Sequence, residues 1–365
     1  MIAAAERVGR LPRLSGSSWT GIVALVAILA VIPLFYSNDY IITVMITGGI
    51  VLVLNTSWNF VLGIAGVWNF GQLAIFALGG YGAGLLMLHT GLPGWVCVIL
   101  GGVFAAGISI LLAFPTLRLY GIYTSLLTFS FAAVVQFIIV NDGSGLTGGS
   151  FGLDTVDGLY PGLGAKAQIH AYYWTVLGVI VVATFAVARI RSSRLGIALQ
   201  TVRDAPGFAA ARGVNPLRYR VIAFAISGFI AGIAGALYVS FNQSITPSVM
   251  GLTPMSIDVT MLVIGGLGTI AGPALGTTLL TIVQTSLVGY PGIQLTILGT
   301  ILLLIVVFVP GGLVGLIVRI KGRISRWVSE GEGGGGGQEP LEPRTHAVTF
   351  DMPDEQPPEA TTPNA

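Results

Sequence analysis

The chain has 365 residues, of which 54% are hydrophobic and only 9% are charged, and its mean hydropathy is +0.86. Soluble domains carry about 25% charged residues, so this chain cannot form a water-facing surface of ordinary polarity. Its single cysteine, Cys97, excludes an intramolecular disulfide framework and a cysteine-based zinc site. The composition therefore predicts an all-α integral membrane protein.

About ten apolar segments are long enough to be transmembrane helices, which need about 17 to 25 residues. In chain order they are residues 20–36, 41–64, 66–89, 95–114, 122–140, 172–188, 221–241, 254–270, 272–289 and 293–309, and glycines interrupt the third. We expect a basic N-terminus over residues 1–19 and a transmembrane domain over residues 20–318. Residues 319–365 form a tail that should be disordered from residue 329, because a segment rich in glycine, proline and glutamate cannot bury a core.

The distribution of basic residues predicts how the spans are oriented. The stretch from Arg189 to Arg220 holds seven arginines and one acid, Asp204. Basic residues in short loops stay in the cytoplasm. We therefore expect both termini, the turn at Arg118 and the loop 190–220 to be cytoplasmic. The loop 141–171 should lie outside, and a count of one crossing per segment gives the same result.

The topology also suggests a repeat. Two halves of five spans each would have opposite orientations in the membrane, which is the arrangement of inverted-repeat transporters. Each half contains a glycine-rich interruption, at residues 63–71 and at residues 265–273. The two halves do not align residue by residue, so the inverted five-helix repeat is an expectation from topology alone.

Enzyme motifs are nearly absent from the sequence. None of the three histidines lies in a His-Glu-x-x-His motif, and no phosphate-binding Gly-x-x-x-x-Gly-Lys loop occurs. We expect no catalytic residue, no metal site, no cofactor and no nucleic-acid partner. If transport uses ATP, another subunit must hydrolyse it.

Polar residues within the spans are candidates for a substrate path. Asn59, Asn69 and Gln72 lie around the interrupted third span, where non-helical backbone must line a cavity or be buried in protein. Hydrogen bonding between helices is the alternative role for each of them. Asp258 is the only carboxylate within a span, and an intramembrane acid indicates a functional site. Its alternative is a position at the outer interface or at a helix start after Pro254.

The arginine-rich loop contains a short predicted helix. Pro206 suits the first helical position, and Asp204 just ahead places negative charge at the positive end of the helix dipole. Ala210 and Ala211 favour helix, and Gly213 suits the left-handed position that ends one. A helix of about two turns is not stable alone in water, so we expect it to pack on a partner. An ordinary connector is the alternative.

Five stretches carry the motifs of a known family. They are Leu-Gly-Ile-Ala-Gly with Phe-Gly-Gln in 54–81, Leu-Arg-Leu-Tyr-Gly in 117–123, Thr-Gly-Gly-x-x-Gly-Leu in 146–153, Arg203-Asp204 with Ala210 and Gly213 in 193–215, and Gly-Gly-Leu-Gly with Pro-Gly-Gly-Leu in 265–313. On these motifs the chain resembles the inner-membrane permeases of ABC importers. Among them it most resembles the M-type subunit of branched-chain amino-acid permeases, over residues 41–316.

The resemblance implies a subunit of an ATP-driven importer for branched-chain amino acids in the bacterial inner membrane. The implied partners are a second homologous permease subunit, two cytoplasmic ABC ATPase subunits and an external substrate-binding protein. The residues implied in ATPase coupling are Arg203, Asp204, Pro206, Ala210, Ala211 and Gly213. A permease for urea or short amides is the nearest alternative, and a secondary carrier or channel that acts alone is another.

Overall fold

A computed structural model describes the chain between Asn38 and Leu316, with gaps. The described residues are 38–119, 121–154, 156, 158–287, 289, 296–297, 299–300, 303–304 and 312–316. The predicted first span 20–36, most of the predicted last span 293–309, and both terminal segments lie outside the described residues.

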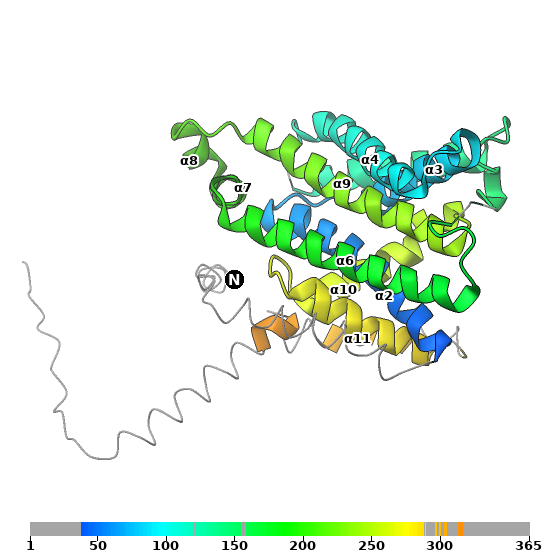
Figure 1. Cartoon of the computed structure of the whole chain (residues 1–365). Coiled ribbons are helices and arrows are strands. Elements are labelled where there is room, and N and C mark those ends of the chain that lie inside the picture. Colours follow the sequence, from blue (N-terminus) through cyan, green and yellow to red (C-terminus); the bar gives the residue numbers. More distant parts are fainter. Residues whose placement is uncertain are drawn as a thin grey trace, which may run out of the picture. The chain divides into compact units, whose positions relative to one another are not determined.

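The described part of the chain is built from helices, apart from one isolated antiparallel bridge between Leu153 and Ile245. In chain order the helices are α2 (Asp39–Asn59), the π-helix η3 (Phe60–Ile64), α3 (Gln72–Thr90), α4 (Gly94–Thr116), α5 (Ile122–Val140), the short η4 (Gly149–Phe151), α6 (Ala165–Ser192), α7 (Arg194–Asp204), α8 (Pro206–Ala211), α9 (Pro216–Asn242), η5 (Pro247–Met250), α10 (Leu252–Gly265) and α11 (Gly272–Ser286) (Figure 1).

Within the described residues, six helices are long and apolar enough to cross a membrane. They are α2 with η3, α3, α4, α5, α6 and α9, and each falls on a predicted span. Helix α5 has the predicted bounds, whereas α6 extends beyond residues 172–188 at both ends because a helix can continue into the polar border of the membrane. The count of ten spans stays a prediction.

Helices α10 and α11 are shorter than the predicted spans 254–270 and 272–289, with 14 and 15 residues. The backbone explains the difference. Gly266 and Gly268 have φ values of +110° and +74°, which belong to the left-handed side of conformational space and cannot continue an α-helix. Residues 266–271 therefore form a non-helical connection between α10 and α11.

Helix α9 packs closely against α3 and α4, and α2 packs against α6, α9 and α11 (Figure 1). Glycines make the α3–α9 contact close. A Cβ atom on Gly79 would collide with the backbone of Gly232, and a Cβ on Gly232 would collide with the side chain of Ala105 in α4. Small residues at such crossings let helix backbones approach in a membrane, where apolar burial alone does not drive helices together.

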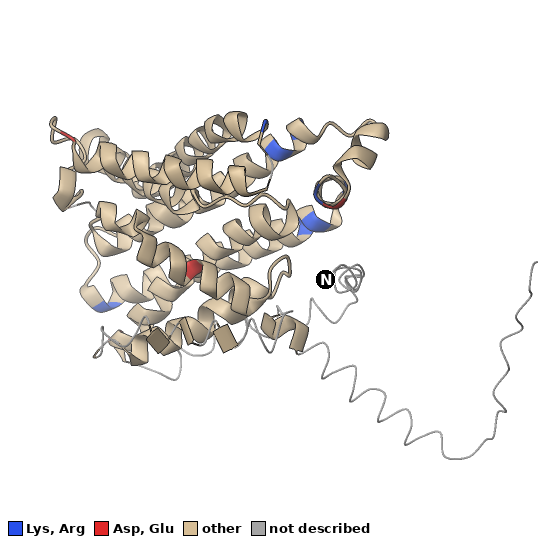
Figure 2. Ribbon diagram, turned by 180° about the vertical axis from the view of Figure 1, so that it is seen from behind, with Lys and Arg blue, Asp and Glu red and all other residues tan. Residues whose placement is uncertain are grey.

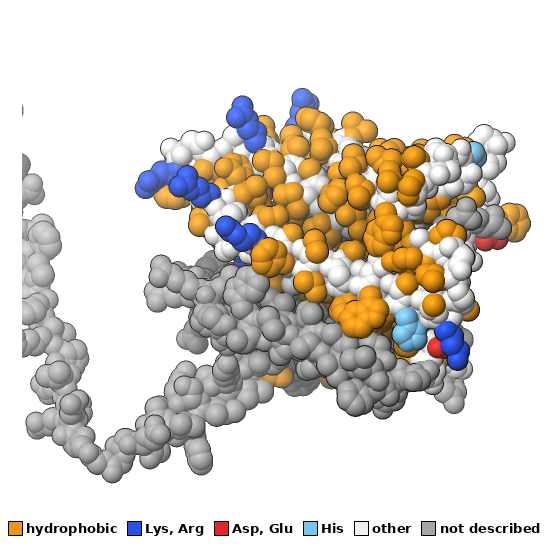
Figure 3. All heavy atoms as spheres, in the orientation of Figure 1, with side chains coloured by type: hydrophobic (Ala, Val, Ile, Leu, Met, Phe, Trp, Pro, Cys, Tyr) orange, Lys and Arg blue, Asp and Glu red, His pale blue; other side chains and the backbone are white. Residues whose placement is uncertain are grey.

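The outer surface of these helices is apolar. Large side chains such as Ile122, Phe137 and Val182 are more than half exposed. On the face seen in Figure 3, hydrophobic side chains cover the middle, and charged side chains lie at the two ends. Only lipid or another apolar protein surface can cover such a band.

Two segments predicted to be cytoplasmic, the turn at Arg118 and the loop 190–220, lie together at one end of the helices. Arg220, at the start of α9, donates a 3.5 Å hydrogen bond to the carbonyl of Leu119, beside the turn at Arg118. Arginines gather at the end formed by α7, α8 and the start of α9 (Figure 2). At the other end, the loop 141–171 pairs through Leu153 with Ile245. The grouping agrees with the charge pattern, and the side of the membrane that each end faces stays a prediction.

Candidate functional site

The end of α2 departs from α-helical geometry. Over Phe60–Ile64 the chain forms a π-helix, in which the amide of Ala65 donates to the carbonyl of Phe60 at 3.0 Å. The chain then turns at Gly66, whose φ is +73°. Short π-helical segments within α-helices occur frequently at functional sites. This irregular segment separates α2 from α3, as the glycines of the sequence predicted.

Asn59 joins this irregular segment to the non-helical connection between α10 and α11. Its amide oxygen accepts a 2.8 Å hydrogen bond from the backbone N–H of Gly268, and its amide nitrogen donates at 2.7 Å to the carbonyl of Thr269. The backbones also touch, since a Cβ on Gly63 would collide with the amide nitrogen of Gly268. The two glycine-rich interruptions therefore form one contact, although about 200 residues separate them.

Helices α2 and α10 run parallel, so the two interruptions lie at the same end of the helices. Asn55 donates a 3.3 Å hydrogen bond to the sulfur of Met261, and four residues later Asn59 contacts Gly268. An inverted repeat would place equivalent interruptions at opposite ends of the helices. These two interruptions therefore do not support the inverted repeat, which stays a prediction from topology.

Asn69 and Gln72 form a buried network between helices. Asn69 donates to the amide oxygen of Gln72 at 2.8 Å, and Gln72 donates to the hydroxyl of Ser57 at 3.0 Å and to the carbonyl of Ser227 at 3.3 Å. The hydroxyl of Thr128 in α5 accepts a 3.0 Å hydrogen bond from the backbone N–H of Phe70, the residue after Asn69. Together with the contacts of Asn59, these bonds favour the interhelical role for Asn59 and Gln72, whereas the side chain of Asn69 bonds locally to Gln72 and to the N–H of Gly71. Their place on a substrate path stays a prediction.

Asp258 lies in the middle of α10, and its side chain is 7% exposed. The helix begins six residues earlier at Leu252, with Gly251 as its cap, so Asp258 does not cap the helix start. Among the described residues no donor hydrogen-bonds to its carboxylate. The alternative of a helix start therefore does not describe this position, and the alternative of an outer interface stays a prediction.

The arginine-rich loop folds into two helices rather than the single predicted one. The predicted short helix is α8 (Pro206–Ala211), and α7 (Arg194–Asp204) precedes it with only Ala205 between them. Asp204 ends α7 and pairs with Arg203, and Ala205 is the cap residue of α8. The sequence contained a signal for α7: Ser193 caps it, and the apolar Leu199 and Val202 on one face are buried.

The end of α8 has the predicted glycine geometry. Gly213 has a φ of +79°, and its N–H donates to the carbonyl of Ala210 while that of Val214 donates to Ala209, both at 3.0 Å. This pair of bonds is a Schellman motif, which satisfies carbonyls that a helix end leaves free. The motif fixes the direction in which the chain leaves α8.

One side of α8 packs on the protein and the other side is bare. Ala209 is fully buried, whereas Phe208 is 56% exposed and Ala210 and Ala211 are exposed. The guanidinium of Arg212 lies 5.2 Å from the centre of the Phe208 ring. Figure 1 shows α8 beyond the ends of α6 and α9. An exposed aromatic ring among small side chains is a surface suited to contact with another protein.

Arg203 connects α7 to the irregular end of α2, a contact that the sequence did not predict. Its guanidinium donates a 2.6 Å hydrogen bond to the carbonyl of Gly63. The aliphatic part of the same side chain lies directly against Gly66, where a Cβ would collide with it. On its other edge the guanidinium forms two hydrogen bonds with the Asp204 carboxylate, of 2.7 and 3.1 Å.

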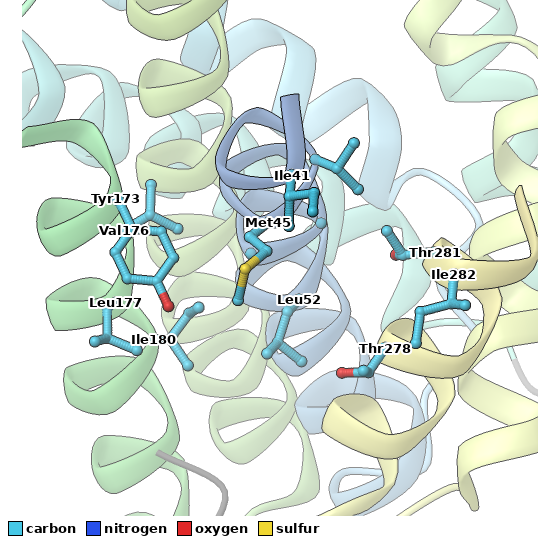
Figure 4. Close-up of a pocket in the computed structure, with 13 residues that line it drawn as sticks. Ile41, Met45, Leu52, Tyr173, Val176, Leu177, Ile180, Thr278, Thr281 and Ile282 are labelled. Carbon is cyan, nitrogen blue, oxygen red and sulfur yellow. The ribbon is translucent and has the colours of Figure 1, made fainter. Parts of the chain in front are cut away.

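A cavity of about 260 Å³ lies between α2, α6 and α11 (Figure 4). Its lining is almost entirely apolar, with side chains such as Met45, Leu177 and Ile180. None of the predicted path residues lines it. A zwitterionic substrate needs partners for an ammonium and a carboxylate group, so this cavity is not a site for such a substrate.

In the loop 141–171, Asp142 organises a tight turn. Its carboxylate accepts hydrogen bonds from the side chains and backbone N–H groups of Ser144 and Thr147. These bonds favour the ionised form and hold the pKa of the Asp142 carboxyl well below its usual range. Phe151, on the same loop, is 93% exposed.

A set of apolar helices in which two broken elements contact each other is the architecture of a multi-pass membrane transport protein. Residues 40–310 match the family described as branched-chain amino acid transport system / permease component. The chain belongs to this family, whose members are transport permeases rather than enzymes.

Three relatives illustrate the similarity. The high-affinity branched-chain amino acid transport system permease protein LivM of Escherichia coli K12 is 26% identical over 88% of this chain and 81% of its own length. The probable LivM permease of Methanocaldococcus jannaschii is 22% identical over 76% of this chain and 94% of its own. The high-affinity branched-chain amino acid transport system permease protein LivH of Escherichia coli K12 is 25% identical over 73% of this chain and 92% of its own length. No solved structure matches this chain significantly.

Proposed function

We propose that this chain is the M-type transmembrane subunit of an ATP-driven importer for branched-chain amino acids. It forms the translocation path together with a second homologous permease subunit. An external substrate-binding protein delivers the substrate, and two cytoplasmic ATPase subunits drive transport. The family match and the similarity to LivM support the substrate class, and similarity to both LivM and LivH supports a pair of related permeases.

The observation that carries the ATPase assignment is the exposed face of α8. It presents Phe208 beyond the ends of the spans, and the Schellman motif at Gly213 holds the helix in one direction. A short rigid helix that moves with a docked partner can pass that movement to the spans. The arginines around it are the basis for placing this end in the cytoplasm, and the basic residues that flank the first and last spans, with the count of ten crossings, are the basis for placing both chain termini there.

Uptake measurements test the function. In a strain that lacks the chromosomal copy, expression of this chain should restore uptake of labelled leucine, and unlabelled isoleucine and valine should compete. Competition by urea or acetamide, without competition by isoleucine, would instead establish the amide alternative. Uptake that persists when the partner ATPases are deleted would establish a carrier that acts alone.

Cysteine labelling tests the docking surface and the orientation. Cys97 is fully buried and can be replaced by alanine to give a background without thiols. In that background, Phe208→Cys should react with a membrane-impermeant thiol reagent only after permeabilisation, and the assembled ATPases should protect it. Phe151→Cys, at the opposite end, is the matched control and should react in intact cells. The reverse pattern would overturn the orientation and the docking site together.

A further inference from the structure

We infer that Arg203 is a positioning residue that transmits movement of α8 to the irregular end of α2 and, through it, to the end of α10. This inference rests on the proposed function, since it assigns a role in ATP-driven transport. It concerns a contact inside this chain, and it gives Arg203 a role different from docking to the ATPases.

The contact joins a cytoplasmic helix to the point where α2 loses its regular geometry. Arg203 donates to the carbonyl of Gly63 at 2.6 Å. Gly63 lies within the π-helix, where the usual ladder of backbone hydrogen bonds is interrupted. A charge-assisted hydrogen bond to a carbonyl is stronger than one between neutral groups. The side chain is only 25% exposed, which limits competition by water.

Two further features make the contact stiff. Asp204 holds the outer edge of the guanidinium through two hydrogen bonds, so the planar group has one orientation. On the inner side, the aliphatic part of Arg203 rests on Gly66, which has no side chain to keep the two segments apart. Rotation of α7 therefore cannot occur without movement of the segment from Gly63 to Gly66.

The same segment is tied to the second broken element. Gly63 contacts Gly268, and Asn59, one turn earlier in α2, is hydrogen-bonded to Gly268 and Thr269. On the cytoplasmic side, α7 and α8 are separated only by Ala205, whose carbonyl accepts from the N–H of Ala209 at 3.0 Å. A continuous set of short contacts thus runs from the exposed face of α8 to both interruptions.

The test uses the assembled importer, purified with its partner subunits and reconstituted in lipid vesicles. Arg203→Gln keeps a hydrogen-bond donor but loses the charge and the pairing with Asp204. We expect the complex to co-purify normally and to hydrolyse ATP, while uptake per ATP hydrolysed falls by at least about tenfold. Asp204→Asn, which leaves Arg203 in place, should give a smaller loss of the same kind.

Arg218→Ala is the matched control, because Arg218 is an exposed arginine in the same loop region outside this set of contacts. It should keep the wild-type ratio of uptake to hydrolysis. Unchanged uptake per ATP in Arg203→Gln would overturn the inference, and so would loss of co-purification, which would make Arg203 a docking residue. If Arg203→Gln does not assemble in the membrane at all, Asp204→Asn decides the question by the same ratio. A wild-type complex that takes up no leucine would instead contradict the proposed function.

Discussion

The side-chain amide of Asn59 binds the backbone on both sides of the Gly268–Thr269 peptide, accepting at 2.8 Å and donating at 2.7 Å. A residue at the end of α2 thereby supplies hydrogen-bond partners to the backbone of the non-helical connection that follows α10. Non-helical backbone at membrane depth is tolerated only where its polar groups have partners or face water. Asn59 supplies those partners.

Replacement of Asn59 by leucine should destabilise the permease. The N–H of Gly268 and the carbonyl of Thr269 would both lose their partner, and a buried unsatisfied group costs about 1–3 kcal/mol. The apparent melting temperature in detergent measures the effect. Asn55→Leu is the matched control on the same helix, because the amide oxygen of Asn55 already lacks a partner. Equal losses for the two variants would contradict the role given to Asn59.

Replacement of Gly66 by alanine should lower the stability of the protein by more than backbone strain alone would. The left-handed conformation costs an L-residue about 1–2 kcal/mol, and a Cβ at Gly66 would also collide with the Arg203 side chain. Gly91 is the matched control: its φ is +60°, but no atom lies within 4 Å of a Cβ placed there. Gly66→Ala should therefore lower thermal stability more than Gly91→Ala does.

A double-mutant cycle isolates the collision. In an Arg203→Ala background, the additional cost of Gly66→Ala should fall towards that of Gly91→Ala, since the Cγ and Cδ atoms of Arg203, which approach the added Cβ most closely, are removed and only its Cβ, at 2.9 Å, remains. If the cost of Gly66→Ala is the same in both backgrounds, the side chain of Arg203 does not rest on Gly66 in the membrane-embedded protein.

Much of the fold could be predicted from the sequence because apolar runs and glycines are strong local signals. Helix α5 has the predicted bounds, since Gly121 precedes it and a polar loop follows. The short helix α8 and its glycine end were predicted from residue types whose backbone preferences are local. The ends of α6 were not, because a helix does not have to stop where its apolar run stops.

The central contacts could not be predicted, since they join residues far apart in the sequence. Arg203 and Gly63 are 140 residues apart, and nothing local indicates which carbonyl an arginine in a basic loop binds. The candidate amides were found by their polarity within apolar segments. Their partners, such as Ser57 and the carbonyl of Ser227 for Gln72, depend on which helices pack together.

Replacement of Gly213 by valine should uncouple ATP hydrolysis from uptake and leave assembly intact. No atom lies within 4 Å of a Cβ at this position, so the effect is purely conformational. A β-branched residue is strongly disfavoured at a φ of +79°, and a six-residue helix depends on its end motif. Gly213→Asn is the control, because asparagine tolerates this conformation. Uptake per ATP, measured in vesicles, should fall for valine and be largely kept for asparagine.

Replacement of Gly232 by valine should prevent α9 from packing against α3 and α4. A Cβ there would collide with the side chain of Ala105 and would lie 2.9 Å from the Cα of Gly102. Overpacking costs about 1–3 kcal/mol in ordinary cores, and here backbones rather than flexible side chains must move apart. Gly178→Val is the matched control, because no atom lies within 4 Å of a Cβ at that position in α6. Size-exclusion profiles of fluorescently tagged protein should show loss of the folded peak for Gly232→Val alone, since valine has a higher helix propensity than glycine and should not harm α6.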